Sequence, residues 1–118
     1  MHRLAYGLIG LIAALHLGFL VLEMFLWQTS FGRKVFGLTR EFAKESAKLA
    51  ANQGLYNGFL AAGLIFGLVT PDSGNQTKVF FLLCVLAAGL YGGLTVKKSI
   101  LIIQALPAAL ALGLLISS

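Results

Sequence analysis

The chain has 118 residues, of which 58% are hydrophobic and 11% are charged, and its formal net charge is +5. Soluble domains carry roughly 25% charged residues, so this composition excludes a water-exposed globule, and the high hydrophobicity excludes a disordered chain. The composition therefore indicates a membrane protein. Because each crossing needs about 20 residues, the length allows four spans.

Long stretches without charge predict four membrane-spanning helices in one domain covering residues 1–118, with spans at about 4–27, 49–70, 79–96 and 99–116. Within the first stretch, Glu23 is the charged exception. This stretch is longer than the apolar core of a signal peptide and ends in Trp27, an aromatic residue typical of the membrane interface. We therefore expect it to be retained, and the predicted fold class is all-α, an integral membrane four-helix bundle.

The connection before the second span has the features of a helix. Thr39 is positioned as an N-cap, and Glu41 falls in the first turn that would follow it. Glu41 with Lys44, and Glu45 with Lys48, have the i,i+3 spacing of paired side chains on one helix face. The pattern predicts a short cytoplasmic or interfacial helix, which either lies on the membrane or continues directly into the second span.

Loop charges predict the orientation. Five basic residues lie between the first two spans, and Lys97 and Lys98 lie between the last two, against Arg3 and Lys78 on the other side. Positively charged loops stay in the cytoplasm, so we expect a multi-pass protein of the bacterial inner membrane with both termini outward. The expected partners are the lipid bilayer and anionic lipid head groups at the basic loops. Nucleic acid is not an expected partner, and the connection around Asp72 is typical of a turn.

Small residues recur at i,i+4 spacing in each predicted span, as in Gly10, Ala14 and Gly18 of the first. Such stripes allow close approach of helix backbones in lipid. We expect them mainly to close the four-helix bundle, with a homodimer through one stripe as the alternative.

Polar residues of the predicted spans fall in the cytoplasmic half. Glu23 is the ionisable acid among them, and a carboxylate at the centre of a span costs about 2.5–3.5 kcal/mol on insertion scales. The candidate ligand-binding residues at similar depth are His16, Glu23, Trp27, Asn52, Gln53, Tyr56, Asn57, Tyr91 and Gln104. They predict a polar pocket that binds or transports a small molecule, in which Glu23 would hold a cation or a proton.

Two other functions stay open at this point. In a membrane-embedded enzyme of isomerase type, His16 and Glu23 would act as proton donor and acceptor on a lipophilic substrate. In a structural or accessory subunit, the polar residues would only fix the register of the helices. The sequence predicts no metal site, which would need three or four ligands, and neither a catalytic triad nor a phosphate-binding loop that would indicate a cofactor.

Several segments together resemble a known family: HLGFLVLEMFLW, GRKVFGL, EFA, LAANQGLYNGFLAAGL and YGGLTVKKSILIIQALPA. The family is the group of bacterial membrane proteins catalogued as domain of unknown function 1304, and the resemblance covers almost the whole chain. It implies a compact four-span membrane protein with the polar residues named above as its motif residues. It implies no particular activity.

Overall fold

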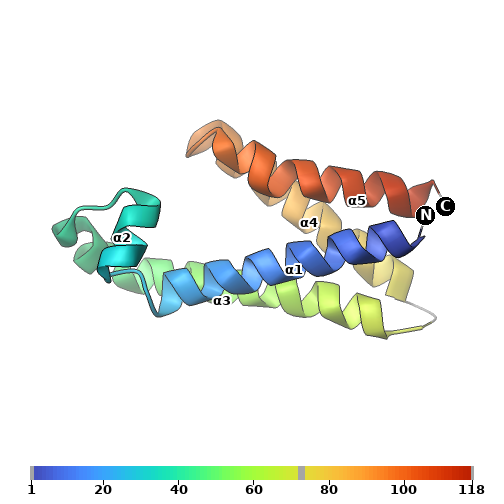
Figure 1. Ribbon diagram of the computed structural model, residues 1–118, viewed down its shortest axis with the longest axis horizontal. Helices are drawn as coiled ribbons and strands as arrows, with labels where there is room; N and C mark the ends of the chain where they lie inside the picture. The colour runs from blue at the N-terminus through green and yellow to red at the C-terminus, as the bar shows by residue number, and fades with distance from the viewer. Residues whose placement is uncertain (1, 72–73, 118) are drawn as a thin grey trace. The chain divides into compact units, whose positions relative to one another are not determined.

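The computed structural model describes residues 2–71 and 74–117. In these residues the regular secondary structure is all helical and contains no strand, which confirms the predicted all-α class. The elements are α1 (His2–Met24), α2 (Ser30–Phe36), α3 (Arg40–Val69), α4 (Gly74–Thr95), the π-helix η1 (Leu101–Ala105) and α5 (Leu106–Ile116) (Figure 1). The turn predicted around Asp72 lies outside the described residues.

The helices form two compact units. Residues 1–14 and 60–118 make one, which we call the terminal unit, and residues 15–59 make the other, which we call the middle unit. The long helices α1 and α3 contribute to both. The terminal unit contains the start of α1, the second half of α3 and all of α4, η1 and α5, whereas the middle unit contains the end of α1, α2 and the first part of α3.

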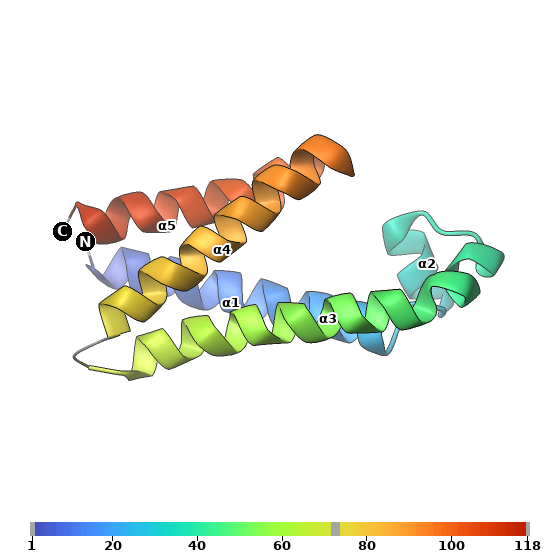
Figure 2. The same ribbon diagram turned by 180° about the vertical axis from the view of Figure 1, so that it is seen from behind.

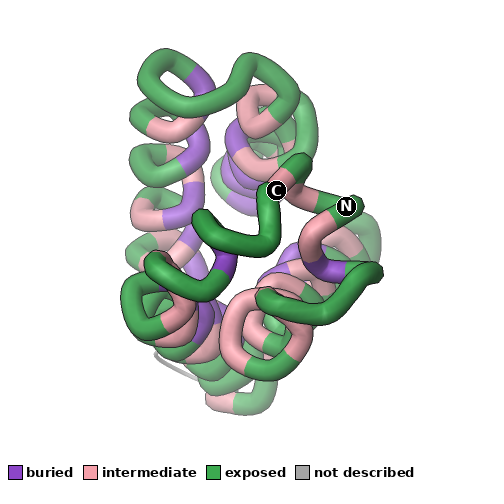
Figure 3. The backbone as a smooth tube through the Cα atoms, turned by 90° about the vertical axis from the view of Figure 1, so that its left-hand side faces the viewer, coloured by how far each residue is buried: buried purple, intermediate pink, exposed green. Residues whose placement is uncertain are grey.

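The terminal unit is built around an apolar core. Its largest fully buried side chains include Ile9 of α1, Leu64 of α3 and Leu82 of α4. Helix α4 packs along η1 and α5, and the start of α1 lies near the end of α5 (Figure 2). Buried positions alternate with exposed ones along the helices, as expected when each helix packs one face (Figure 3).

Glycines set the closest contact in this unit. A Cβ at Gly89 of α4 would lie 2.6 Å from the backbone nitrogen of Ala105, so a larger residue would push α4 away from η1. A Cβ at Gly93 would overlap the side chain of Leu101. The prediction that small residues close the packing is therefore correct for α4. At Gly10 and Gly113 the structure shows no such close approach, since no atom beyond the chain neighbours and the helix's own nearby backbone lies within 4 Å of a Cβ built there.

The π-helix η1 ends two residues before Pro107. Proline has no N–H, and its ring crowds the carbonyl four residues earlier, so the regular α-helical hydrogen bonds are interrupted. The backbone N–H of Leu106 donates instead to the oxygen of Leu101, five residues back. Within the fourth predicted span, 99–116, residues 101–105 are accordingly π-helical and residues 106–116 are α-helical.

In the middle unit, the first helix ends earlier than predicted. Helix α1 stops at Met24, so Trp27 lies in the turn that follows rather than at a helix end. The helix capped by Thr39 is confirmed, because the backbone N–H of Phe42 donates to its hydroxyl at 3.1 Å. This helix continues directly into the second predicted span as α3, which is the second of the two arrangements expected.

Helix α2 was not predicted. It starts at Thr29, whose hydroxyl accepts a hydrogen bond from the backbone N–H of Gly32 at 3.1 Å. It ends at Gly37, whose φ of 68° is the left-handed conformation that glycine adopts without strain. Seven residues are too few to show a helical pattern of hydrophobic residues. The capping residues Thr29 and Gly37 are therefore the sequence features that indicate this helix.

Within residues 2–71 and 74–117, two helices have the length and the apolar composition needed to cross a membrane: α1 over Arg3–Met24, and α4 over Gly74–Thr95. Helix α3 begins with charged residues followed by the amides Asn52, Gln53 and Asn57, which lower its hydropathy, and Leu101–Ile116 is a shorter apolar helix. The two long apolar helices weakly favour a membrane protein, and the four-span bundle stays a prediction.

Candidate functional site

The end of α1 contacts α3 through Glu23. The side-chain nitrogen Nδ2 of Asn57 donates a hydrogen bond of 2.5 Å to Oε1 of Glu23, and Asn57 is 6% exposed. One turn earlier on α3, a Cβ at Gly54 would lie 2.8 Å from Cγ of Met24 and 3.0 Å from Cβ of Glu23. Glycine at this position therefore lets α3 approach closely enough for Asn57 to reach the carboxylate.

Trp27 connects the turn after α1 with both neighbouring helices. Its indole Nε1 donates to the hydroxyl of Ser46 on α3 at 3.0 Å, and that hydroxyl donates to the carbonyl of Phe42 at 2.6 Å. The ring centre of Trp27 lies 4.9 Å from that of Phe36 on α2, with the planes tilted by 44°. The indole is thus fixed on one side by a hydrogen bond and on the other by ring packing.

Helix α2 packs directly against the backbone of this turn. Gly32 is buried, and a Cβ there would overlap the carbonyl of Leu26. The Nε of Arg33 donates to the carbonyl of Gln28 at 3.3 Å. These contacts hold α2 beside the residues that follow Glu23.

A pocket of about 250 Å³ lies within the middle unit. Its lining comes from the end of α1, the following turn and one position of α3: Glu23, Met24, Phe25, Trp27, Gln28, Thr29 and Ala47. Glu23 therefore accepts a hydrogen bond from the Asn57 amide and also lines the pocket. We call this space the Glu23 pocket.

The remaining sequence candidates of the middle unit lie outside this lining. His16 is 1% exposed, and its ring packs edge-to-face on Phe19 with centres 5.3 Å apart. Asn52 and Gln53 are exposed, and Tyr56 is 57% exposed. The structure thus brings together Glu23, Trp27 and Asn57. Glu23 and Trp27 line the pocket, and Asn57 is hydrogen-bonded to Glu23.

The last two candidates belong to the terminal unit. Tyr91 on α4 is 73% exposed, and Gln104 is half-buried in η1.

Sequence reasoning missed part of the pocket wall and one buried cation. Gln28 and Thr29 line the pocket, and the N-cap position of Thr29 is the available sequence signal. Lys78 was counted as a loop charge, yet it is 4% exposed. Its Nζ donates to the carbonyl of Gly67 at 2.9 Å and lies 4.9 Å from the ring centre of Tyr6, so all three groups meet inside the terminal unit.

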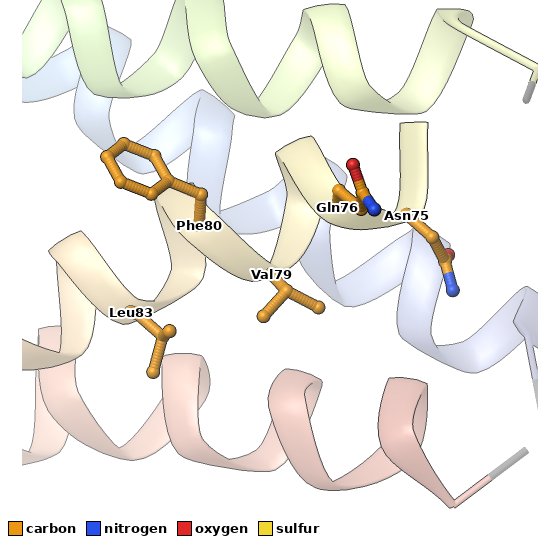
Figure 4. A pocket seen from close by; sticks show the side chains of 5 residues that line it. All are labelled: Asn75, Gln76, Val79, Phe80 and Leu83. Atoms are coloured by element: carbon orange, nitrogen blue, oxygen red, sulfur yellow. The ribbon is translucent and has the colours of Figure 1, made fainter. Parts of the chain in front are cut away.

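A second hollow lies along α4 and is almost wholly apolar. It has a volume of about 400 Å³ and is lined by Asn75, Gln76, Val79, Phe80 and Leu83. Figure 4 shows these side chains projecting from successive turns of α4. No ionisable group lines it, so it offers no charge with which to recognise a polar ligand.

Metal chemistry has no suitable ligand set in residues 2–71 and 74–117, where no group of three or more His, Cys, Asp or Glu side chains is placed to hold an ion. The pocket lining brings together one acidic residue, a tryptophan and a threonine.

Comparison with known proteins shows one relative of similar length. The chain is 31% identical, over 108 residues, to the uncharacterised protein YpaA of Lactococcus lactis subsp. lactis (strain IL1403), covering 89% of this chain and 91% of YpaA. No solved structure matches the chain. The family described as "Protein of unknown function (DUF1304)" matches residues 10–116, which include every residue of the Glu23 pocket, and the chain belongs to this family.

Proposed function

We propose that the chain is an integral membrane protein that binds or transports a small molecule at the Glu23 pocket. The observation that carries this proposal is a carboxylate in the wall of a pocket of about 250 Å³. Ionisable residues within membrane-spanning segments are costly to retain and are therefore functional candidates by default. Drug-sized ligands occupy about 300–1,000 Å³, so this pocket fits a smaller ligand.

The membrane placement that we propose is a single domain of four spans in the bacterial inner membrane, with anionic lipid head groups at the basic loops. The apolar character of α1 and α4 supports it, as does the concentration of basic residues between α1 and α3. In this placement both termini face outward. Glu23, at the end of α1, then lies near the cytoplasmic interface, so the pocket opens towards the cytoplasm.

Cysteine labelling tests the placement. The chain has one native cysteine, Cys84, which is replaced by serine before a single cysteine is introduced at Ser30 or at Ser117. We expect a membrane-impermeant maleimide to label the Ser117→Cys variant in intact spheroplasts and the Ser30→Cys variant after permeabilisation. Labelling in the opposite order would overturn the orientation, and recovery of the protein from the soluble fraction would overturn the membrane placement.

A thermal-shift screen tests the binding function. The wild-type protein, Glu23→Gln and the matched control Glu45→Gln, which alters an exposed acid outside the pocket, are screened against one library of small molecules. We expect compounds that stabilise the wild type and the control but not Glu23→Gln. Flux of each such compound into proteoliposomes then separates transport from binding. If every active compound stabilises all three proteins equally, Glu23 is not part of a binding site.

A structural role is the second candidate, because the Asn57–Glu23 hydrogen bond joins α1 to α3. This role predicts that Glu23→Gln and Asn57→Ala lower the unfolding temperature and leave every ligand response unchanged. The enzyme alternative lacks such support, since His16 is not among the residues that line the Glu23 pocket.

A further inference from the structure

We propose that the Glu23 pocket is selective for an organic ammonium ion with a short hydrocarbon chain. The inference rests on the proposed binding function and names its ligand class. It follows from the hydrogen-bonding capacity that the lining residues have left after their contacts within the protein.

Donors in the pocket wall are mostly engaged. The indole N–H of Trp27 is given to Ser46, and the Thr29 hydroxyl donates to the carbonyl of Leu26 at 2.6 Å while it accepts from Gly32. The backbone N–H of Thr29 also donates to Leu26, at 3.1 Å. Among the lining side chains, Gln28 carries the remaining N–H donors, so an anion would find few partners here.

Acceptors remain available. A carboxylate offers about four lone-pair positions, and Asn57 occupies one of those on Glu23. Trp27 also lines the pocket, and the π-system of an indole ring attracts cations. A ligand that donates hydrogen bonds and carries positive charge complements both groups.

Basic residues are absent from the wall of the Glu23 pocket. No Lys or Arg of the middle unit lines the pocket, although Nε of Arg33 donates to the carbonyl of the lining residue Gln28. The negative charge of Glu23 is therefore presented to the ligand without a neighbouring cation in the wall.

The rest of the wall defines the shape of the ligand. Met24, Phe25 and Ala47 are apolar and suit a hydrocarbon chain, whereas a metal ion would need three or more ligand side chains, which the described residues do not gather. The volume of about 250 Å³ limits the chain to a short one. An alkylammonium ion meets all of these conditions.

The single tryptophan of the chain makes the test direct, because Trp27 lines the pocket and its fluorescence reports occupancy. The full-length protein in detergent is titrated with butylammonium, with its neutral analogue butanol and with its anionic analogue butyrate. We expect saturable binding of butylammonium at least about tenfold tighter than that of butanol, since the ligand gains a charged hydrogen bond. Butyrate should give no saturable change.

Three variants sharpen the test. Glu23→Gln keeps an acceptor for Asn57, and hence the packing, and should weaken butylammonium binding by at least about tenfold. Ala47→Leu leaves the carboxylate in place and fills the pocket, so it should also abolish the response. Glu45→Gln removes an equal charge from an exposed position and should bind like the wild type.

The results separate the two proposals. If butanol or butyrate binds as well as butylammonium and Ala47→Leu abolishes that binding, the pocket is a binding site and the ammonium inference is wrong. If none of the three probes changes the fluorescence and the thermal-shift screen also finds no compound that depends on Glu23, both proposals are overturned.

Discussion

In the terminal unit, the ammonium of Lys78 lies 2.9 Å from the carbonyl of Gly67 and 4.9 Å from the centre of the Tyr6 ring. In the middle unit, the carboxylate of Glu23 accepts one hydrogen bond from Asn57 and lines a pocket. Both groups carry a cost of burial. The contacts of Lys78 join three helix segments, whereas the half-buried Glu23 accepts one hydrogen bond and keeps further acceptor positions, which we propose are used by a ligand.

The two units also differ in what holds them together. The terminal unit has a core of large buried side chains such as Ile9, Leu64 and Leu82. Among the described residues of the middle unit, the buried hydrophobic side chains are those of Ala43 and Ala50. The middle unit therefore depends more on hydrogen bonds and on close backbone packing. Units with few buried apolar contacts open more readily, which favours ligand entry.

The largest effect is expected from Gly89→Ala in the terminal unit. The new Cβ would lie 2.6 Å from the Ala105 nitrogen, and because the obstacle is backbone, α4 and η1 must separate. We expect a loss of about 3 kcal/mol, the upper end of the range for overpacking, measured by thermal unfolding in detergent. Gly113→Ala is the control, since open space surrounds that position, and it should be neutral or slightly stabilising. Equal effects of the two changes would contradict the close packing of α4.

Asn57→Ala should have the next largest effect. It removes the donor of the bond to Glu23, and hydrogen bonds to charged groups contribute about 1.5–3 kcal/mol, so we expect a loss of about 2 kcal/mol. Glu23→Gln, which keeps the acceptor, should lose less than about 1 kcal/mol. A stability loss in Glu23→Gln as large as that in Asn57→Ala would favour the structural role of this pair.

Lys78→Met tests whether the buried charge of the terminal unit serves packing within that unit. The carbonyl of Gly67, in the last turn of α3, would lose its donor, but the desolvation cost of the ammonium would also disappear. We expect a net loss of about 1 kcal/mol in chemical unfolding, with butylammonium binding at Trp27 unchanged. Loss of binding in this variant would show that the two units are not independent in function.

Trp27→Phe is expected to have the smallest effect. Phenylalanine keeps the ring packing on Phe36 and removes the N–H bonded to Ser46, so protection of the α2 amides in hydrogen exchange should fall by about 1 kcal/mol. Ser46→Ala should lose at least as much, because it also removes the hydrogen bond from the Ser46 hydroxyl to the Phe42 carbonyl. The double variant should lose no more than Ser46→Ala, because the Trp27–Ser46 bond is already broken there, and additive losses would refute that bond.

Long apolar helices and one helix cap could be predicted from the sequence. The all-α class and the Thr39 cap depend on local pattern, and the structure confirms both. Glu23 and Trp27 could be named as site residues because charge and aromatic type are visible in the chain. Their partners Asn57 and Ser46 could be fixed only by tertiary contact.

Other features had no sequence signal strong enough to decide them. In the sequence, Lys78 is a charged residue near a predicted helix end. Its burial depends on the close approach of Gly67 and Gly74, which a sequence pattern does not reveal. Asn52, Gln53 and Tyr56 were expected in the site from their depth along α3. Depth does not specify the face of a helix, and the structure leaves all three exposed.

The π-helix η1 restricts insertions and deletions in the segment that precedes Pro107. An α-helix turns about 100° per residue. A π-helical turn contains one residue more than an α-helical turn, so η1 changes the direction in which the residues before it face relative to those of α5. Deleting one residue between Leu101 and Ala105 would allow regular α-helical bonding, yet it would rotate the preceding residues by about 100° and move Leu101 away from Gly93. The number of residues before Pro107 is thus as strongly constrained by the packing on α4 as their identity is.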